Sequence, residues 1–195
     1  MKILRFFLIG VAFGVAAQLL GELTATPLGR GMCNLSVLGG NLDVYPLIIV
    51  LLLLRKTAEP KAIAGGVLLF FAGLCLGYYG YTTAFSAVAA VRMHDPEMFA
   101  TNALSDLVDG LAYTALGVMA ALWCYVAKRL RNRGKRLLYG CMLAPFFAVT
   151  VMMVVENARC VVPNVAMMVV DVLCLAAMAA AVWCSEQMKP TEETV

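Results

Sequence analysis

The chain has 195 residues, of which 63% are hydrophobic and 14% charged, and its formal net charge is +3. Its mean hydropathy of +0.87 is far above that of an ordinary water-soluble domain. This composition leaves no room for a soluble domain, so we expect an integral membrane protein with no nucleic-acid partner.

Six apolar stretches have about the length that a helix needs to cross a bilayer, roughly 20 residues. We therefore expect an all-α polytopic fold in which residues 1–195 form one transmembrane bundle. The six predicted spans are 4–22, 35–54, 62–82, 103–127, 137–156 and 164–185.

Two of these spans have unusual patterns. The first half of 35–54 is rich in glycine and polar residues, which predicts a re-entrant segment or a capping loop before a shorter helix from Pro46. The helical pattern that starts at Ala62 continues to Met93, about 48 Å at 1.5 Å per residue, which exceeds a bilayer. We expect this helix to bend near Gly80 and to end at the turn "HDPE".

The N-terminus is similar to a secretory signal, because Lys2 and Arg5 precede an apolar stretch that ends in small residues. Leu23 is unfavourable three positions before a cut after Ala25. We therefore expect the segment to remain as the first span.

The basic residues predict the orientation of the spans. All but three of the 15 lysines and arginines fall on one side of a six-span bundle, the exceptions being Arg30, Arg92 and Arg159. The positive-inside rule makes this side, and both termini, cytoplasmic. The loop 128–136, "KRLRNRGKR", then either anchors the topology on anionic headgroups or docks a cytoplasmic partner.

Acidic residues gather at the opposite side, and each helix that enters from outside has one near its start. Asp43 and Asp106 lie close to predicted helix starts, where a carboxylate complements the positive end of the helix dipole. An asparagine precedes each start and is expected to cap it: Asn41, Asn102 and Asn164.

Asp109 and Asp171 lie deeper, about 9 to 10 Å inside their spans at 1.5 Å per residue, beyond the reach of the dipole. An ionisable group at that depth costs roughly a few kcal/mol unless it is hydrated, paired or protonated, so both should face the bundle interior. They line a water-filled cavity open to the outside, or they pair with each other or with Arg159. Tyr113 follows Asp109 by four residues and shares its helix face.

Further polar residues are expected near the same outer surface. Glu156 lies in "VVENARC" close to Arg159, which predicts either a local ion pair or a wall of the cavity. The motif "GYYGY" places Tyr78, Tyr79 and Tyr81 at the outer interface. These tyrosines either anchor the helix there or turn inward toward a ligand.

Glycines recur on one face of the first and third spans, where they allow helices to approach closely. They are expected to pack inside the bundle or against another membrane subunit, and they are Gly10, Gly14, Gly66, Gly73 and Gly77.

Sequence motifs of enzymes and metal sites are missing. There is no phosphate-binding glycine loop and no nucleophile elbow, and an intramembrane enzyme built on Asp106 and Asp109 lacks a nucleophile, so we expect neither catalysis nor a cofactor. His94 lies beside two carboxylates too close in sequence to hold a metal well. Cys33 and Cys160 are both expected outside and could form a disulfide.

In architecture the chain resembles the substrate-binding subunit, or S component, of energy-coupling factor transporters. Its length, six spans, long first loop from Gly21 to Leu42 and the small-residue face at Ala12 and Ala16 carry this resemblance. The resemblance implies that Ala12 and Ala16 contact a membrane coupling subunit, which in turn binds a cytoplasmic ATPase in the bacterial cytoplasmic membrane. The chain is also similar to uncharacterised six-span proteins of gut bacteria.

The sequence therefore predicts a membrane protein that captures a small solute from outside. The acidic outer half favours a cationic or donor-rich solute. The alternative is a non-transport protein, such as a regulator or immunity factor, that binds another protein. The predicted solute site comprises Asp43, Asp109, Tyr113, Glu156, Asp171, Tyr78 and Tyr81.

Overall fold

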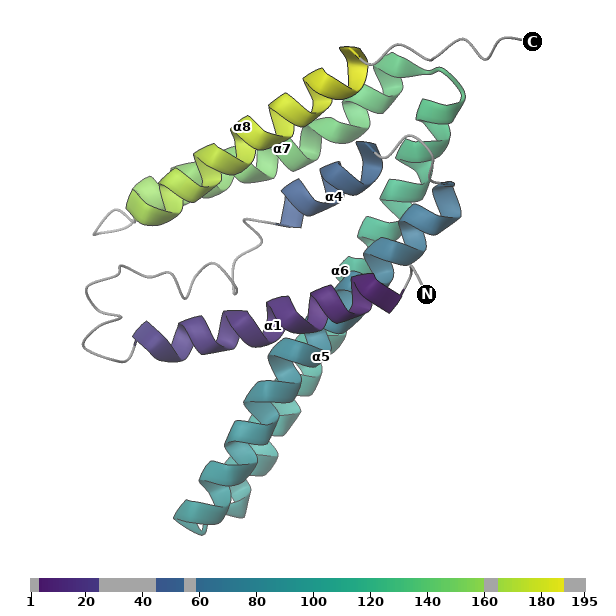
Figure 1. The fold of residues 1–195 in the computed structure, drawn as a ribbon. Helices are drawn as coiled ribbons and strands as arrows, with labels where there is room; N and C mark the ends of the chain where they lie inside the picture. The colour runs from purple at the N-terminus through teal and green to yellow at the C-terminus, as the bar shows by residue number, and fades with distance from the viewer. Residues whose placement is uncertain (1–3, 25–44, 55–58, 160–164, 188–195) are drawn as a thin grey trace.

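A computed structural model describes residues 4–24, 45–54, 59–159 and 165–187, and this part of the chain consists of helices joined by short turns. The helices, labelled as in Figure 1, are α1 (Leu4–Thr24), α4 (Tyr45–Leu54), α5 (Pro60–Met93), α6 (Pro96–Asn132), α7 (Arg136–Arg159) and α8 (Val165–Gln187).

Four of the described helices are long and apolar enough to cross a membrane. They are α5, α6, α7 and the part of α8 from Met167 to Ser185. Two shorter apolar helical segments, Leu4–Leu19 within α1 and all of α4, accompany them. The length and apolarity of these helices indicate a membrane protein.

The helix α4 covers only the second half of the predicted span 35–54. It begins at Tyr45, with Pro46 in its first turn, where a missing backbone N–H costs nothing because no intrahelical partner exists for it. The prediction of a shorter helix from about Pro46 agrees with this start. Residues 35–44, including Asp43, lie outside the described residues.

The helix α5 is uninterrupted through Gly80, the residue near which the sequence predicts a bend. Its 34 residues correspond to about 51 Å at 1.5 Å per residue. A glycine inside a helix costs only about 1 kcal/mol relative to alanine. Packing against α6 on both sides of Gly80 outweighs this cost and keeps the helix continuous.

The helix α6 begins at Pro96, earlier than the predicted start at 103. Asp95 caps it, since the Asp95 carboxylate accepts a hydrogen bond from the backbone N–H of Met98 at 3.1 Å. The prediction that Asn102 caps this helix is therefore wrong. Asn102 lies in the second turn, where its amide donates to the Ser86 hydroxyl at 3.4 Å.

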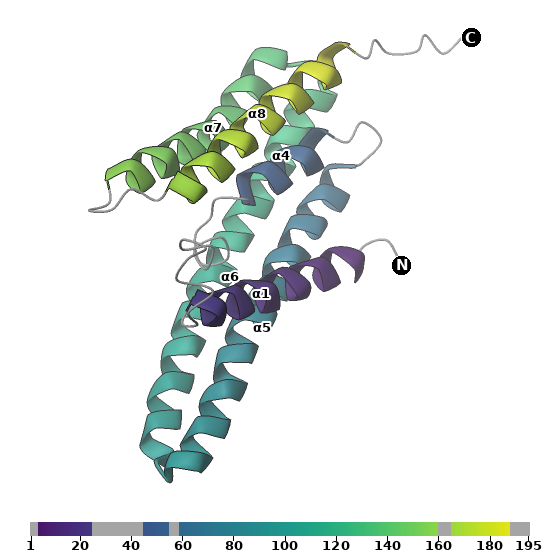
Figure 2. The same ribbon diagram turned by 60° about the vertical axis from the view of Figure 1, so that its left-hand side comes forward.

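A short turn joins α5 to α6 and makes them antiparallel neighbours. His94 ends α5 with φ 56°, the left-handed conformation common after a helix C-terminus. The backbone N–H of Asp95 then donates to the Ala90 carbonyl at 3.1 Å. Figures 1 and 2 show that α5 and α6 stay side by side from this turn onward, forming the α5–α6 hairpin.

Glycines bring the backbones of α1 and α5 into direct contact where the two helices cross (Figure 1). A Cβ at Gly73 would overlap the Phe7 carbonyl oxygen, and a Cβ at Gly10 would overlap the Phe70 carbonyl oxygen. The predicted packing of these glycines inside the bundle is confirmed. The residues of this glycine contact are Gly10 and Gly14 of α1 with Gly73 and Gly77 of α5.

The helix α4 lies in the centre of the apolar core. The Tyr45 ring packs against the rings of Phe70 and Phe71, with centroids 6.0 Å apart in each case. At the other end of α4, Lys128 and Arg131 donate to the Leu53 carbonyl oxygen at 3.4 Å and 3.0 Å. Because the last carbonyls of a helix lack intrahelical partners, these cations hold the end of α4 against α6.

The helices α7 and α8 form a second antiparallel pair. They pack on each other and on α4, which connects them to the α5–α6 hairpin. Figures 1 and 2 show the two pairs meeting near the α6–α7 turn and diverging away from it.

We predict that Gly73→Ala destabilises the fold, because its methyl group has no space beside the Phe7 carbonyl. Overpacking of this kind costs about 1–3 kcal/mol. Thermal unfolding of the purified protein in detergent measures the loss. Gly140→Ala is the matched control, since a Cβ there meets no atom within 4 Å and the better helix propensity of alanine makes the change neutral or stabilising. Equal melting temperatures for the two variants would contradict the glycine contact.

Candidate functional site

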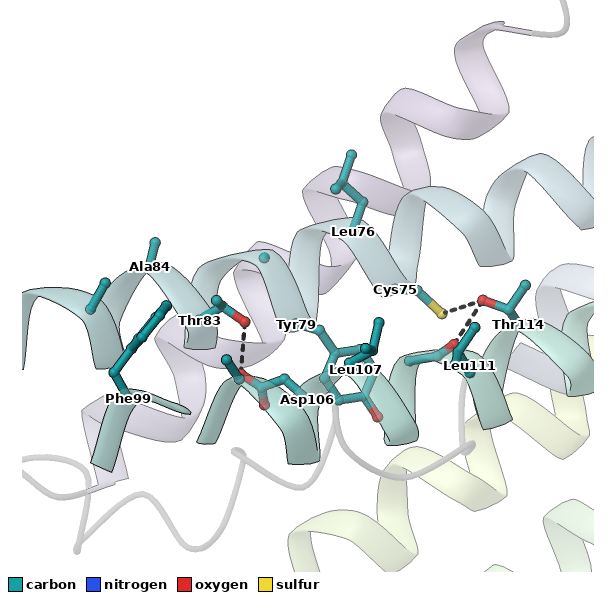
Figure 3. Close-up of a pocket in the computed structure, with 14 residues that line it drawn as sticks. Cys75, Leu76, Tyr79, Thr83, Ala84, Phe99, Asp106, Leu107, Leu111 and Thr114 are labelled. Carbon is teal, nitrogen blue, oxygen red and sulfur yellow. Dashed lines mark hydrogen bonds between the residues drawn. The ribbon is translucent and has the colours of Figure 1, made fainter. Parts of the chain in front are cut away.

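The candidate site is an open groove along one face of the α5–α6 hairpin, with a volume of about 710 Å³ (Figure 3). Its walls are mostly apolar, and five polar or sulfur-bearing side chains interrupt them. We call it the Asp106 groove, and its lining residues are Cys75, Leu76, Tyr79, Gly80, Thr83, Ala84, Ala87, Phe99, Ala103, Asp106, Leu107, Gly110, Leu111 and Thr114.

Asp106 is the one carboxylate in this lining. Its Oδ2 accepts a hydrogen bond from the Thr83 hydroxyl at 2.8 Å and lies 2.9 Å from the Thr82 hydroxyl. The Thr82 hydroxyl is also 2.9 Å from the Tyr79 carbonyl oxygen, so it shares one proton between two acceptors. Both hydrogen bonds to the Asp106 carboxylate end on Oδ2, which leaves Oδ1 for a ligand.

The Tyr79 ring of α5 enters this site because α6 has a glycine opposite it. The Tyr79 ring packs over Gly110, where an added Cβ would come within 3.4 Å of it. One helix turn deeper, the Thr114 hydroxyl donates to the Gly110 carbonyl at 2.7 Å and lies 3.8 Å from the Cys75 sulfur.

A cluster of tyrosines borders the groove. Tyr79 packs against Tyr78 with ring centroids 5.0 Å apart, and against Tyr113 with centroids 6.1 Å apart. Asp109 lies within electrostatic range of the Tyr79 and Tyr113 hydroxyl groups. The structure thus brings together three residues of the predicted site, namely Tyr78, Asp109 and Tyr113.

The other members of the predicted site lie elsewhere. Tyr81 is half-buried on α5, and Glu156 is exposed on α7. Asp43 is outside the described residues. Asp171 belongs to α8, which packs on α7 and α4, and no described groove is lined by both Asp171 and Asp109.

The surroundings of Asp106 and Asp109 in the structure are the reverse of those predicted from the sequence. Asp109, predicted to face the bundle interior, is exposed, whereas Asp106, predicted to lie at the helix start, is half-buried against α5. The reason is that α6 begins at Pro96, which moves both residues into the helix, and the antiparallel register directs Asp106 toward the two threonines.

Asp171 forms a buried polar pair between α7 and α8. Its side chain is 0% exposed, and its Oδ2 accepts a hydrogen bond from the Asn157 amide at 2.9 Å. Its Oδ1 has no hydrogen-bond partner among the described residues. The predicted burial of Asp171 is therefore confirmed, but its partner is Asn157, while Arg159 is exposed.

Ala12 and Ala16 are both exposed on α1. Within the described residues, no group of three or more His, Cys, Asp and Glu side chains could hold a metal ion. The possible disulfide between Cys33 and Cys160 lies outside the part of the chain that the structure describes.

Sequence reasoning missed Thr82, Thr83 and Thr114. The sequence does contain a signal for such contacts. Residues that are the same number of positions before and after His94 meet across the α5–α6 hairpin. Thr82 and Asp106 are such a pair, as are Ser86 and Asn102. Counting outward from the "HDPE" turn therefore identifies these contacts.

The fold and the groove define a class, a helical membrane protein with a single carboxylate in an open apolar groove. No protein-family model, curated protein or solved structure matches the chain.

We predict that Asn157→Leu destabilises the α7–α8 pair by about 1–3 kcal/mol, because it leaves the buried Asp171 carboxyl without its described donor. Chemical or thermal unfolding in detergent measures the effect. Thr150→Val serves as the control, since the Thr150 hydroxyl is also buried but bonds only to the Phe146 carbonyl of its own helix. A loss no larger than that of Thr150→Val would show that the pair contributes little.

Proposed function

We propose that this protein binds a small amphiphilic molecule, with a cationic or donor-rich head, in the Asp106 groove. The observation that carries the proposal is the half-buried Asp106 carboxylate, held by two threonine hydroxyls at the edge of a 710 Å³ apolar groove. Ligand sites of about 300–1,000 Å³ commonly combine apolar walls with a few converging polar groups.

The openness of the groove favours an amphiphile over a fully polar solute. Leu76, Leu107 and Leu111 line it and are 59%, 59% and 62% exposed. In a bilayer these side chains face lipid, so a bound molecule keeps its apolar part in contact with both leucines and acyl chains. Its head then reaches Asp106, where a positive charge or an N–H group satisfies the carboxylate.

The proposal includes six spans with both termini in the cytoplasm of a bacterial cell. In such a topology α1 and α5 both run outward. The glycine contact supports this direction, because Gly10 lies against Phe70 and Gly14, further along α1, lies against Leu74, further along α5. The helices α4 and α6 both run inward, and Lys128 of α6 reaches the last carbonyls of α4. The basic α6–α7 turn then lies on the cytoplasmic side.

For a role in transport, we propose that the protein also binds a membrane coupling subunit. The exposed positions of Ala12 and Ala16 on α1 suit contact with another membrane helix, since small side chains allow close approach.

A second candidate function is the binding of another membrane protein by the outer part of the α5–α6 hairpin. Large apolar side chains are exposed there beyond the crossing with α1. Phe85 is 59% exposed, Val91 77%, Met93 69% and Leu104 63%. Under this candidate, small amphiphiles leave the stability of the protein unchanged.

We predict that alkylamines raise the melting temperature of the wild type in a non-ionic detergent, while alkyl alcohols of the same chain length do so less. A ligand at 100 times its Kd stabilises by about 2.7 kcal/mol. Asp106→Asn should abolish the preference for amines, because it removes the charge that faces the groove.

Asp109→Asn is the matched control for this experiment. It removes the same charge three residues away on an exposed position that does not line the groove, so it should respond as the wild type does. The proposal fails when no amine stabilises the wild type, or when Asp106→Asn and Asp109→Asn respond alike.

A further inference from the structure

A second groove lies on the same hairpin, near the opposite ends of α5 and α6. It has a volume of about 380 Å³ and is apolar except at one end. We call it the Lys61 groove, and it is lined by Lys61, Ala64, Gly65, Leu68, Val118, Ala121, Leu122 and Tyr125.

The apolar part of the Lys61 groove is lined by small and large apolar residues of both helices. Gly65 leaves its floor open, since an added Cβ would meet no atom within 4 Å. Leu68 and Leu122 form its sides and are 39% and 63% exposed. Both belong to helices long and apolar enough to cross a membrane, so these walls face acyl chains.

The polar end of the groove is basic. Lys61 lies in the first turn of α5 and is exposed, and Tyr125 faces it from α6. Arg129 follows Tyr125 by four residues and therefore continues the same face of α6, where it is also exposed. Lys61 and Arg129 therefore place two cations near this end of the groove, beside Tyr125.

The neighbouring cations of α6 are directed elsewhere. Lys128 is 1% exposed and donates to the Leu53 carbonyl, as does Arg131, which also lies over the Tyr139 ring with its guanidinium carbon 5.3 Å from the centroid. These contacts fix the last turns of α6 and, within the part of the chain that the structure describes, leave Lys61 and Arg129 as cations near the groove.

We propose that the Lys61 groove binds an anionic phospholipid, with one acyl chain between α5 and α6 and the headgroup phosphate between Lys61 and Arg129. This site is separate from the Asp106 groove and carries the opposite charge. Charge complementarity selects the occupant: a zwitterionic lipid brings its own cation to a basic end, whereas phosphatidylglycerol brings only negative charge.

The test is native mass spectrometry of the detergent-purified full chain, titrated with phosphatidylglycerol or with phosphatidylcholine of the same acyl chains. The wild type should bind phosphatidylglycerol more tightly. Lys61→Gln and Arg129→Gln should each weaken this binding about fivefold, as expected for one basic residue near a headgroup, and weaken binding of phosphatidylcholine less, because its choline cation offsets the phosphate charge. Arg133→Gln is the control, since it also removes an exposed basic charge, but four residues further along the chain from the groove than Arg129.

A second pair of variants tests the position of the acyl chain. Gly65→Leu places an apolar side chain in the groove, with open space at its Cβ, and should weaken binding of phosphatidylglycerol, whereas Gly140→Leu, at a glycine of α7 equally open at the Cβ, should not. Dihexanoyl phosphatidylglycerol, whose chains are too short to fill the groove, should bind more weakly than the long-chain lipid. The proposal is overturned when the wild type shows no preference for phosphatidylglycerol, when Arg133→Gln weakens binding as much as Arg129→Gln, or when Gly65→Leu binds as the wild type does.

Discussion

The turn at His94 and Asp95 is the constraint on which the rest of the hairpin depends. It fixes the register of α5 against α6, and a register fixed at one end propagates along two continuous helices of 34 and 37 residues. The threonines of α5 meet Asp106 for this reason, and Tyr79 meets Gly110. A shift by one residue would rotate these contacts by about 100°, since a helix has 3.6 residues per turn.

A different kind of constraint holds the remaining helices to this hairpin. The glycine contact joins α1 to α5 through backbone atoms, and it needs no polar group. The contact of α4 with α6 is the opposite case, because two cations bind one carbonyl group at the end of a ten-residue helix. Dispersion therefore fixes α1, whereas hydrogen bonds to charged groups add to apolar packing in fixing α4.

The helices themselves were predictable from the sequence, because length and apolarity depend only on local composition. The close packing of Gly10 and Gly73 was predictable for a similar reason, since glycine spacing marks a helix face. The partner of Asp171 was not, because the sequence offers Asn157, Arg159 and several acids within reach. Burying a neutral amide costs less desolvation free energy than burying a guanidinium group. This difference favours Asn157 over Arg159 as the partner of Asp171. The start of α6 was missed because Asp95 and Pro96 were assigned to a turn and not to a cap.

The Asp106 and Lys61 grooves share one face of the hairpin, away from the glycine contact with α1. A molecule that partitions into lipid would thus reach Asp106 by lateral diffusion, without an aqueous channel through the protein. Its concentration at the carboxylate would follow its membrane partition coefficient more closely than its concentration in water.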